Sequence, residues 1–366
     1  MLFIIIIITV LLCFLYFLMI LKFIRGWKNI PSFEPKDSID INFRVSVIVP
    51  CKNEQKNILK LLSSIAQQSY QNFELIIVDD HSTDKTVNSI QSAKAYLPQI
   101  RLIHAKGQGK KNALKEGIAE AGSDLIIITD ADCIPSYHWI EAIALFQKHF
   151  PSDLIICPVC LSGKNNMFSR LQTLEFSSLV GVAAGSSGAG MPILCNGANL
   201  AFRKKTWLKF QHNLHDDELS GDDMFLLENV KKAGGRISFM KSEAGIVISK
   251  TPDNLQKFIH QRRRWAAKSK LYTDWSIIFV ALIVLAISLL NFAFLALTAF
   301  KWYYIFGCLG VFVFKYIMDT RFLYLVRRYS QLERIWGYSF VLSVFYPYYI
   351  VFTAISALLF KPKTWK

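Results

Sequence analysis

The sequence has 366 residues, of which 52% are hydrophobic, and a formal net charge of +15 at pH 7. Its basic residues gather beside apolar segments and it has no DNA- or RNA-binding signature, so the charge favours anionic lipid headgroups over nucleic acid. Its seven cysteines, an odd and scattered set, do not form the pattern of a disulfide framework.

An apolar run, Leu2 to Leu21, comes first and is interrupted only by Thr9 and Tyr16. It is long enough to cross a hydrocarbon core of ~30 Å. A cleaved signal peptide would need charge before the run, a shorter run and a small-residue cleavage site, and the sequence has none of these. We therefore expect residues 1–24 to form an uncleaved transmembrane anchor and residues 25–43 a linker.

Strand-like and helix-like stretches alternate in the next part of the chain. The expected strands are Val45–Val49, Glu74–Val78, Ile100–His104 and Leu125–Thr129. Helices are expected from about Glu54, from Asp84 and over Lys110–Glu120. Leu75–Val78 and Leu125–Ile128 are continuously apolar, which is typical of strands buried on both faces. The alternation therefore predicts an α/β domain with a mostly parallel sheet.

Two pairs of aspartates follow two of these strands. Asp79 and Asp80 end the second strand, and Asp130 and Asp132 come directly after the fourth. Open α/β sheets bind ligands at the carboxyl ends of their strands, and paired carboxylates are hard oxygen ligands for Mg²⁺ or Mn²⁺. We expect residues 44–275 to bind a metal and a phosphorylated nucleotide.

The stretch from Met167 to Ala201 is apolar, rich in small residues between Gly181 and Gly190, and contains Asn196-Gly-Ala-Asn199. One interpretation is a helix and loop that rest on the membrane surface and shape an acceptor site. A core helix followed by a flexible loop is the other.

Three further apolar spans are expected in a membrane domain of residues 276–366: Ser276–Phe300, Trp302–Met318 and Gly337–Phe360. The predicted number of transmembrane helices is therefore about four. Basic residues precede the first of these spans and, with Arg321 and Arg334, separate the last two. The positive-inside rule then places residues 22–275 in the cytosol, at an inner or plasma membrane. Lys315 lies near a span end, where snorkelling explains it better than transport does.

Five short motifs occur in order: Val45-Ser-Val-Ile-Val-Pro-Cys-Lys-Asn-Glu54, Ile77-Val-Asp-Asp-His-Ser-Thr-Asp84, Asp130-Ala-Asp132, Gly221-Asp-Asp223 and Gln261-Arg-Arg-Arg-Trp265. Together they resemble a membrane-anchored family 2 glycosyltransferase with a GT-A, Rossmann-like fold. Asp-x-Asp alone occurs by chance in many chains, whereas five motifs in order are specific. The resemblance implies an inverting, metal-dependent hexosyltransferase that moves a sugar from a nucleotide-sugar, a UDP-sugar in particular, to a lipid or glycan acceptor.

The resemblance also implies which residues bind the donor. The nucleoside would lie against Pro50, Asn53, Glu54, Asp79 and Asp80, with no choice between the two aspartates for the base. The metal, Mg²⁺ or Mn²⁺, would be held against the diphosphate by Asp130 and Asp132. Lys110, which follows Gly107 and Gly109, is a further candidate for phosphate, although the P-loop pattern is missing.

Catalysis would fall to Asp223, the base that deprotonates an acceptor hydroxyl, with Asp222 beside it. Acidic residues that merely open a helix would also suit the helix dipole, and the family context favours catalysis. Gln261, Arg264 and Trp265 would meet the acceptor and the diphosphate, since an aromatic face suits a sugar or lipid and guanidinium suits phosphate.

Other functions stay open. A processive polysaccharide synthase shares these motifs, but about four helices make a small secretion channel, which favours glycolipid or short-glycan synthesis. A catalytically silent scaffold would bind the nucleotide without releasing UDP. A transporter would need polar groups along the spans, for which Asn291 and Lys315 make a thin case.

Overall fold

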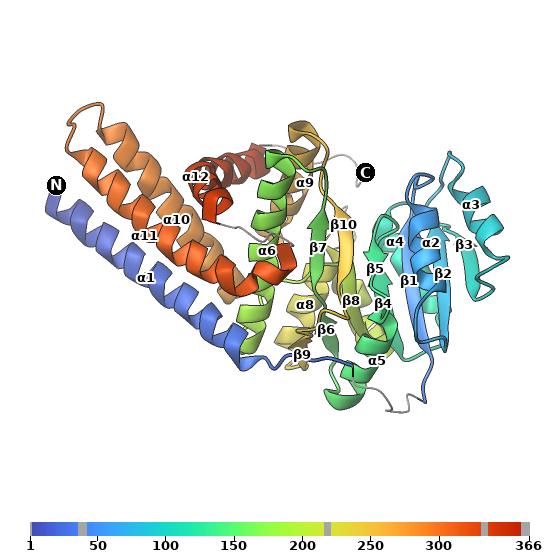
Figure 1. Ribbon diagram of the computed structural model, residues 1–366. Helices are drawn as coiled ribbons and strands as arrows, with labels where there is room; N and C mark the ends of the chain where they lie inside the picture. The colour runs from blue at the N-terminus through green and yellow to red at the C-terminus, as the bar shows by residue number, and fades with distance from the viewer. Residues whose placement is uncertain (1, 36–41, 216–220, 331–335, 360–366) are drawn as a thin grey trace. The chain divides into compact units, whose positions relative to one another are not determined.

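The computed structural model describes residues 2–35, 42–215, 221–330 and 336–359 (Figure 1). The chain packs as two units. The first contains the residues up to Asn29, Gly163–Ile193 and the part that begins at Thr251, whereas the second contains Ile30–Ser162 and Leu194–Lys250.

The second unit is built on a seven-stranded sheet with the strand order β3-β2-β1-β4-β8-β6-β9. Its parallel half consists of β1 (Val45–Cys51), β2 (Phe73–Asp79), β3 (Ile100–His104) and β4 (Leu125–Thr129). β8 (Asn199–Arg203) runs antiparallel to both β4 and β6 (Leu154–Ile156), and β9 (Ile237–Phe239) pairs with β6 in parallel. The predicted α/β fold with a mostly parallel sheet is confirmed.

The central strands are buried on both faces, as their continuous apolar sequences predict. Every residue of β1 and of β4 is buried. Helix α4 (Lys110–Glu120) packs on β1 and β2, and α2 (Ile58–Ala66) packs against α3 (Thr86–Ala93). Helices α2 and α3 begin later than the predicted starts at about Glu54 and at Asp84. The residues before them bind each other instead: the backbone N–H groups of Glu54 and Gln55 donate to the side chains of Thr86 and Asp84.

The strand order places β1 between β2 and β4: the chain adds β2 and β3 on one side of β1 and then crosses to add β4 on the other side. Such a switch point leaves a crevice at the carboxyl ends of the strands, where ligands bind in open α/β sheets. Asp79, Asp80 and Asp130 lie at this edge, at the ends of β2 and β4.

Smaller elements complete the second unit. A three-stranded sheet has the order β5-β10-β7, formed by β5 (Ile134–Pro135), β10 (Val247–Lys250) and β7 (Val159–Ser162). The remaining α-helices are α5 (Trp139–His149), α7 (Lys204–Phe210) and α8 (Asp222–Lys232).

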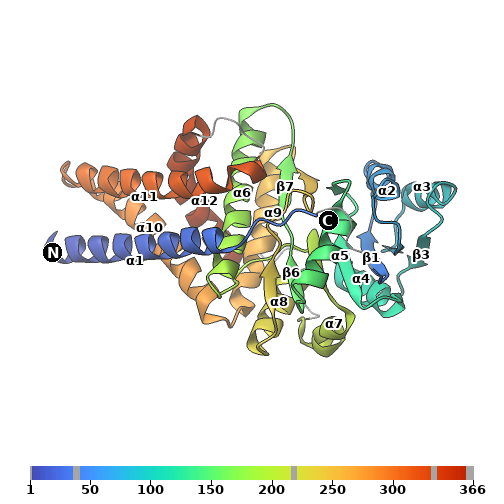
Figure 2. The same cartoon turned by 60° about the horizontal axis from the view of Figure 1, so that its bottom comes forward.

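The first unit is helical (Figure 2). It contains α1 (Leu2–Asn29), α6 (Met167–Gly188), α9 (Leu255–Ala267), α10 (Trp275–Leu297), α11 (Tyr304–Val326) and α12 (Trp336–Leu359). Helices α6 and α9, which belong in sequence to the stretch 44–275, pack here with the apolar helices: α6 against α1, and α9 against α12.

Three helices of the described residues are long and apolar enough to cross a membrane: Phe3–Asn29, Trp275–Leu297 and Gly337–Ser356. The described part of the chain thus has three candidate spans, as in a multi-pass membrane protein, and the predicted number of about four is wrong. The expected span Trp302–Met318 lies mostly in α11, which continues past Met318 and carries Lys315, Asp319 and Arg321. Arg334, used for the predicted topology, lies outside the described residues.

Glycines set the contact between α1 and α6. A Cβ atom at Gly26 would lie 1.9 Å from the carbonyl oxygen of Gly185, and one at Gly185 would lie 2.6 Å from that of Phe23. Small residues let helix backbones approach closely in membranes, where packing replaces the hydrophobic effect. The small-residue stretch noted in the sequence is thus explained by a helix contact.

We expect Gly185→Ala to lower the stability of the protein in detergent by about 1–3 kcal/mol, because the added methyl group overpacks this contact. Gly310→Ala in α11 is the matched control, since a Cβ there meets no atom within 4 Å. Thermal unfolding of both variants measures the difference. Equal melting temperatures would contradict the prediction.

Candidate active site

The loops after β1 and β2 are bound to each other through the predicted nucleoside residues. Asn53 has a left-handed φ of 54°, and its side-chain Oδ1 accepts a hydrogen bond of 2.9 Å from the N–H of Thr83. Its own N–H donates to Ser82 Oγ at 2.9 Å. Pro50 is a buried residue of β1 in register with Val78. The structure therefore brings Pro50, Asn53 and Glu54 together with the end of β2.

Asp79 and Asp80 are both buried at this edge. Asp80 Oδ1 accepts from the N–H of Gly109 at 3.0 Å, and its Oδ2 lies 3.3 Å from Lys52 Nζ. Asp79 Oδ2 accepts from Ser82 N–H at 3.2 Å. Asp80 thus connects the loops that follow β1 and β3, a rigid frame on which a nucleoside can bind.

Lys110 joins the acidic motifs into one cluster. It opens α4, and its Nζ donates to Asp130 Oδ1 at 2.5 Å. Burial alone would lower the pKa of Lys110, but Asp130, Asp222 and Asp223 outweigh it and raise the pKa above its ordinary value. The motifs Asp130-Ala-Asp132 and Gly221-Asp-Asp223, about ninety residues apart in the sequence, therefore share one electrostatic site.

Asp132 lies beside Asp130 in the same cluster. Burial and the neighbouring Asp130 carboxylate raise the pKa of Asp132, while Lys110 and Lys250 oppose the rise. A bound cation would reduce the electrostatic repulsion between these two partly buried carboxylates.

Asp223 is held at the start of α8 by backbone donors. Its Oδ2 accepts from the N–H of Gly197 at 2.9 Å and its Oδ1 from the N–H of Met224 at 2.8 Å. Gly221, just before the helix, has a φ of 106°. Asp222 is buried, whereas Asp223 is half-buried. The sequence does not indicate that Gly197 binds Asp223, although it links the loop Asn196-Gly-Ala-Asn199 to the acceptor.

The donor set fits Mg²⁺ or Mn²⁺ better than a closed metal centre. Among the described residues, no group of three or more His, Cys, Asp and Glu side chains could hold a metal ion. Mg²⁺ in nucleotide sites is commonly bound by one or two carboxylates together with substrate phosphates. Asp130 and Asp132 meet that requirement once a diphosphate is present.

The remaining predicted site residues, Gln261, Arg264 and Trp265, lie on α9 in the first unit. The ring centroid of Trp265 is 6.2 Å from that of Phe176 on α6. Arg262 Cζ lies 4.2 Å from the Trp265 ring centroid. Their predicted contacts with the diphosphate and the acceptor remain predictions.

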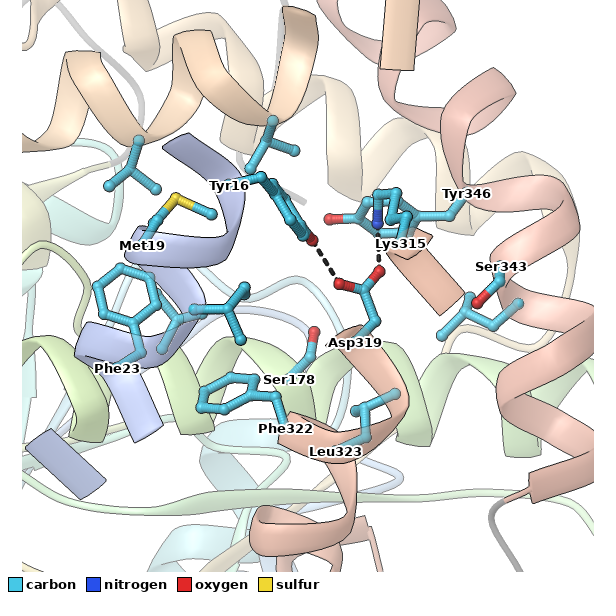
Figure 3. Close-up of a pocket in the computed structure, with 15 residues that line it drawn as sticks. Tyr16, Met19, Phe23, Ser178, Lys315, Asp319, Phe322, Leu323, Ser343 and Tyr346 are labelled. Carbon is cyan, nitrogen blue, oxygen red and sulfur yellow. Dashed lines mark hydrogen bonds and ion pairs between the residues drawn. The ribbon is translucent and has the colours of Figure 1, made fainter. Parts of the chain in front are cut away.

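A cavity of about 90 Å³ lies within the first unit, lined by residues of α1, α6, α10, α11 and α12 (Figure 3). Its walls are mostly apolar, and Tyr16 and Lys315 both bind Asp319 on one side. Lys315 is 5% exposed and its Nζ lies 4.6 Å from the ring centroid of Tyr346. Lys315 is thus paired within the helices rather than extended as a snorkelling side chain.

Residues 46–209 match the family model described as "Glycosyl transferase family 2". The poly-beta-1,6-N-acetyl-D-glucosamine synthase of Staphylococcus aureus (strain COL) is 26% identical over 239 residues, which cover 64% of this chain and 56% of that protein. The probable glycosyltransferase YdaM of Bacillus subtilis (strain 168) is 25% identical over 250 residues, 65% of this chain and 58% of that protein. The chain thus spans little more than half the length of these relatives.

Among solved structures, the mannosyltransferase PcManGT from Pyrobaculum calidifontis, in complex with GDP-Man and Mn²⁺, has a TM-score of 0.56 at 18% identity. The match covers 89% of this chain and 99% of that one. It confirms the fold, the GT-A α/β domain.

Proposed function

We propose that this chain, which is a family 2 glycosyltransferase with membrane helices, transfers a hexosyl group from a UDP-sugar to a lipid or glycan acceptor, with inversion at the anomeric carbon. The observation that carries the proposal is the cluster of Lys110, Asp130, Asp222 and Asp223 at the edge of the sheet. It combines a phosphate-binding cation, metal-binding carboxylates and a base in one place.

The nucleoside would bind to the frame formed by Asn53, Glu54, Asp79 and Asp80. Their backbone and side-chain bonds fix the loops after β1 and β2 before any donor arrives. A preformed site loses less conformational entropy on binding than a mobile one. We assign Pro50 to the floor of this site because it lies buried in β1.

The diphosphate would lie near Lys110, Asp130 and Asp132. A divalent cation held by the two aspartates would neutralise the charge that develops on the leaving nucleoside diphosphate. Lys110 adds a half-buried positive charge, and binding of the donor would replace its contact with Asp130 by one with phosphate.

Asp223 would accept the proton of the acceptor hydroxyl. In the step, the acceptor oxygen forms a bond to the anomeric carbon, the bond from that carbon to the β-phosphate oxygen breaks, and its electron pair leaves with UDP. The N–H groups of Gly197 and Met224 keep the Asp223 carboxylate oriented without occupying every lone pair. Asp222, buried beside it, adds to the negative potential that Lys110 balances.

Gln261, Arg264 and Trp265 would contact the acceptor and the diphosphate. The apolar helices of the first unit suit an acceptor that reaches the site from the bilayer, and the basic α9 suits a cytosolic membrane surface. We therefore place the catalytic segment, residues 44–275, on the cytosolic side.

The relatives favour a second form of the same activity. The S. aureus relative is named as a synthase of a poly-N-acetyl-D-glucosamine, so repeated transfer is a competing proposal and UDP-N-acetylglucosamine is the first donor to test. The three candidate spans among the described residues make a small bundle, which favours single transfer.

Release of UDP by membranes that contain the protein tests the function. A panel of UDP-sugars is supplied with Mn²⁺ or Mg²⁺, with and without EDTA, and GDP-mannose serves as a non-uridine donor. We expect turnover of one UDP-sugar that EDTA abolishes, and product length then separates single from repeated transfer. Binding of UDP without release would overturn the proposal in favour of a scaffold.

A further inference from the structure

A buried ion pair lies beside Trp265 in the first unit. Arg262 Nη2 donates to Glu175 Oε2, and the two side chains are 3% and 7% exposed. Removing two charges from water costs several kcal/mol per ion, so such a pair adds little net stability compared with apolar side chains of similar volume. The ion pair between Arg262 and Glu175 therefore matters mainly through the geometry that it imposes on its neighbours.

The guanidinium of Arg262 lies between two aromatic rings of its own helix. Its Cζ is 4.2 Å from the ring centroid of Trp265 and 4.8 Å from that of Phe258. A cation within about 6 Å of an aromatic face is attracted to it, and a planar guanidinium also stacks on it. The position of Arg262 therefore restricts the orientation of the indole.

Helix α6 supplies the other constraints. Phe176, next to Glu175 in sequence, has its ring centroid 6.2 Å from that of Trp265. Burial raises the pKa of Glu175, whereas Arg262 and a hydrogen bond with Tyr349 of α12 oppose the rise. One carboxylate thus connects α6 to α9 and α12.

We propose that Glu175 is a positioning residue for the acceptor site: it fixes Arg262 against the indole and thereby holds Trp265 in the orientation that receives the acceptor. This inference rests on the proposed function, in which Trp265 contacts the acceptor. It adds to the motif Gln261-Arg-Arg-Arg-Trp265 a partner on another helix, 87 residues before Arg262 in the chain.

A double-mutant cycle of Glu175→Gln and Trp265→Ala tests the proposal in the full chain in nanodiscs. Glu175→Gln is expected to lower kcat/KM for the acceptor by about 10–100-fold, since small misplacements of a positioning group have effects of this size. The donor KM should stay unchanged. The double variant should be no slower than Trp265→Ala, because Glu175 acts through the indole.

Two further variants accompany the cycle, one as an alternative member and one as a control. Arg262→Lys keeps the buried charge but loses the planar fork, so it should show a partial loss that is also absent once Trp265 is alanine. It replaces Glu175→Gln in the cycle if that variant does not fold. Asp253→Asn is the matched control, because it removes an exposed ion pair with Lys257 just before the same helix. It should keep full activity.

A readout independent of turnover separates this inference from the proposed function. Acrylamide quenching of Trp265, taken as the difference from a Trp265→Phe chain, should increase in Glu175→Gln. Unchanged quenching would overturn the positioning role whether or not the chain is active. Multiplicative losses in the cycle, or a loss confined to the donor KM, would overturn it as well. A wild-type chain that turns over no donor would instead contradict the proposed function.

Discussion

Replacing Asp223 by asparagine is expected to lower the rate of sugar transfer by about 10²–10⁴-fold, the range that a general base contributes. The amide keeps the size of the side chain and can still accept the N–H bond of Gly197, but it cannot take up the hydroxyl proton. Donor binding should persist because the nucleoside frame lies on other loops. The measurements are UDP release in the presence of acceptor and, separately, UDP binding by the variant.

The control for this prediction is Asp124→Asn, an exposed aspartate of the same unit just before β4. It should transfer sugar at the wild-type rate. A transfer rate in Asp223→Asn within a few-fold of the wild type would show that another group, or none, deprotonates the acceptor.

Replacing Asp132 by asparagine is expected to weaken the response to divalent cations and to reduce transfer by roughly 10²-fold or more, because a metal supplies several kcal/mol of charge stabilisation. The substitution removes one of the two carboxylates that would hold the cation. A titration of activity with Mn²⁺ should show a midpoint at a higher concentration than in the wild type. EDTA should abolish what remains.

Asp132→Asn also separates metal binding from fold stability. Burial and Asp130 raise the pKa of the Asp132 carboxyl, which means that its charged form destabilises the fold. Because the substitution removes this charge, the apo protein should melt at the same temperature or higher. Wild-type Mn²⁺ dependence in this variant would contradict the assignment of Asp132 as a ligand.

Much of the α/β domain is predictable because its signals are local. The ranges Ile100–His104, Leu125–Thr129 and Lys110–Glu120 match the observed β3, β4 and α4. Continuous apolar runs that end in Gly or Asp are typical of buried parallel strands, and the aspartates after them fall at the ligand-binding edge. The position of Asp79, Asp80 and Asp130 follows from strand order alone.

The remaining features depend on contacts between distant residues. Nothing in the spacing of Lys110 and Asp130 shows that they pair, and Gly197 is recognised only because its N–H meets Asp223. The packing of α6 with α1 depends on Gly26 and Gly185, which are far apart in sequence. The predicted number of spans is too high because Trp302–Met318 stops one residue before Asp319, so it leaves out Asp319 and Arg321, which lie in the same helix as Lys315.

The contact between Tyr16 and Asp319 has a consequence for how the protein is made. The two residues are 303 positions apart, so at ~5–20 residues per second the ribosome needs about 15–60 s to synthesise the partner of Tyr16. During that time α1 is long and apolar enough to stay in the bilayer without α11.

The helical unit is therefore completed only after insertion of its first member. Until α11 is made, the Tyr16 hydroxyl of α1 lacks the Asp319 carboxylate that it binds in the folded protein, and the later helices then pack against α1. Because Asp319 lies on α11, the final packing of α1 in this unit depends on the synthesis of α11.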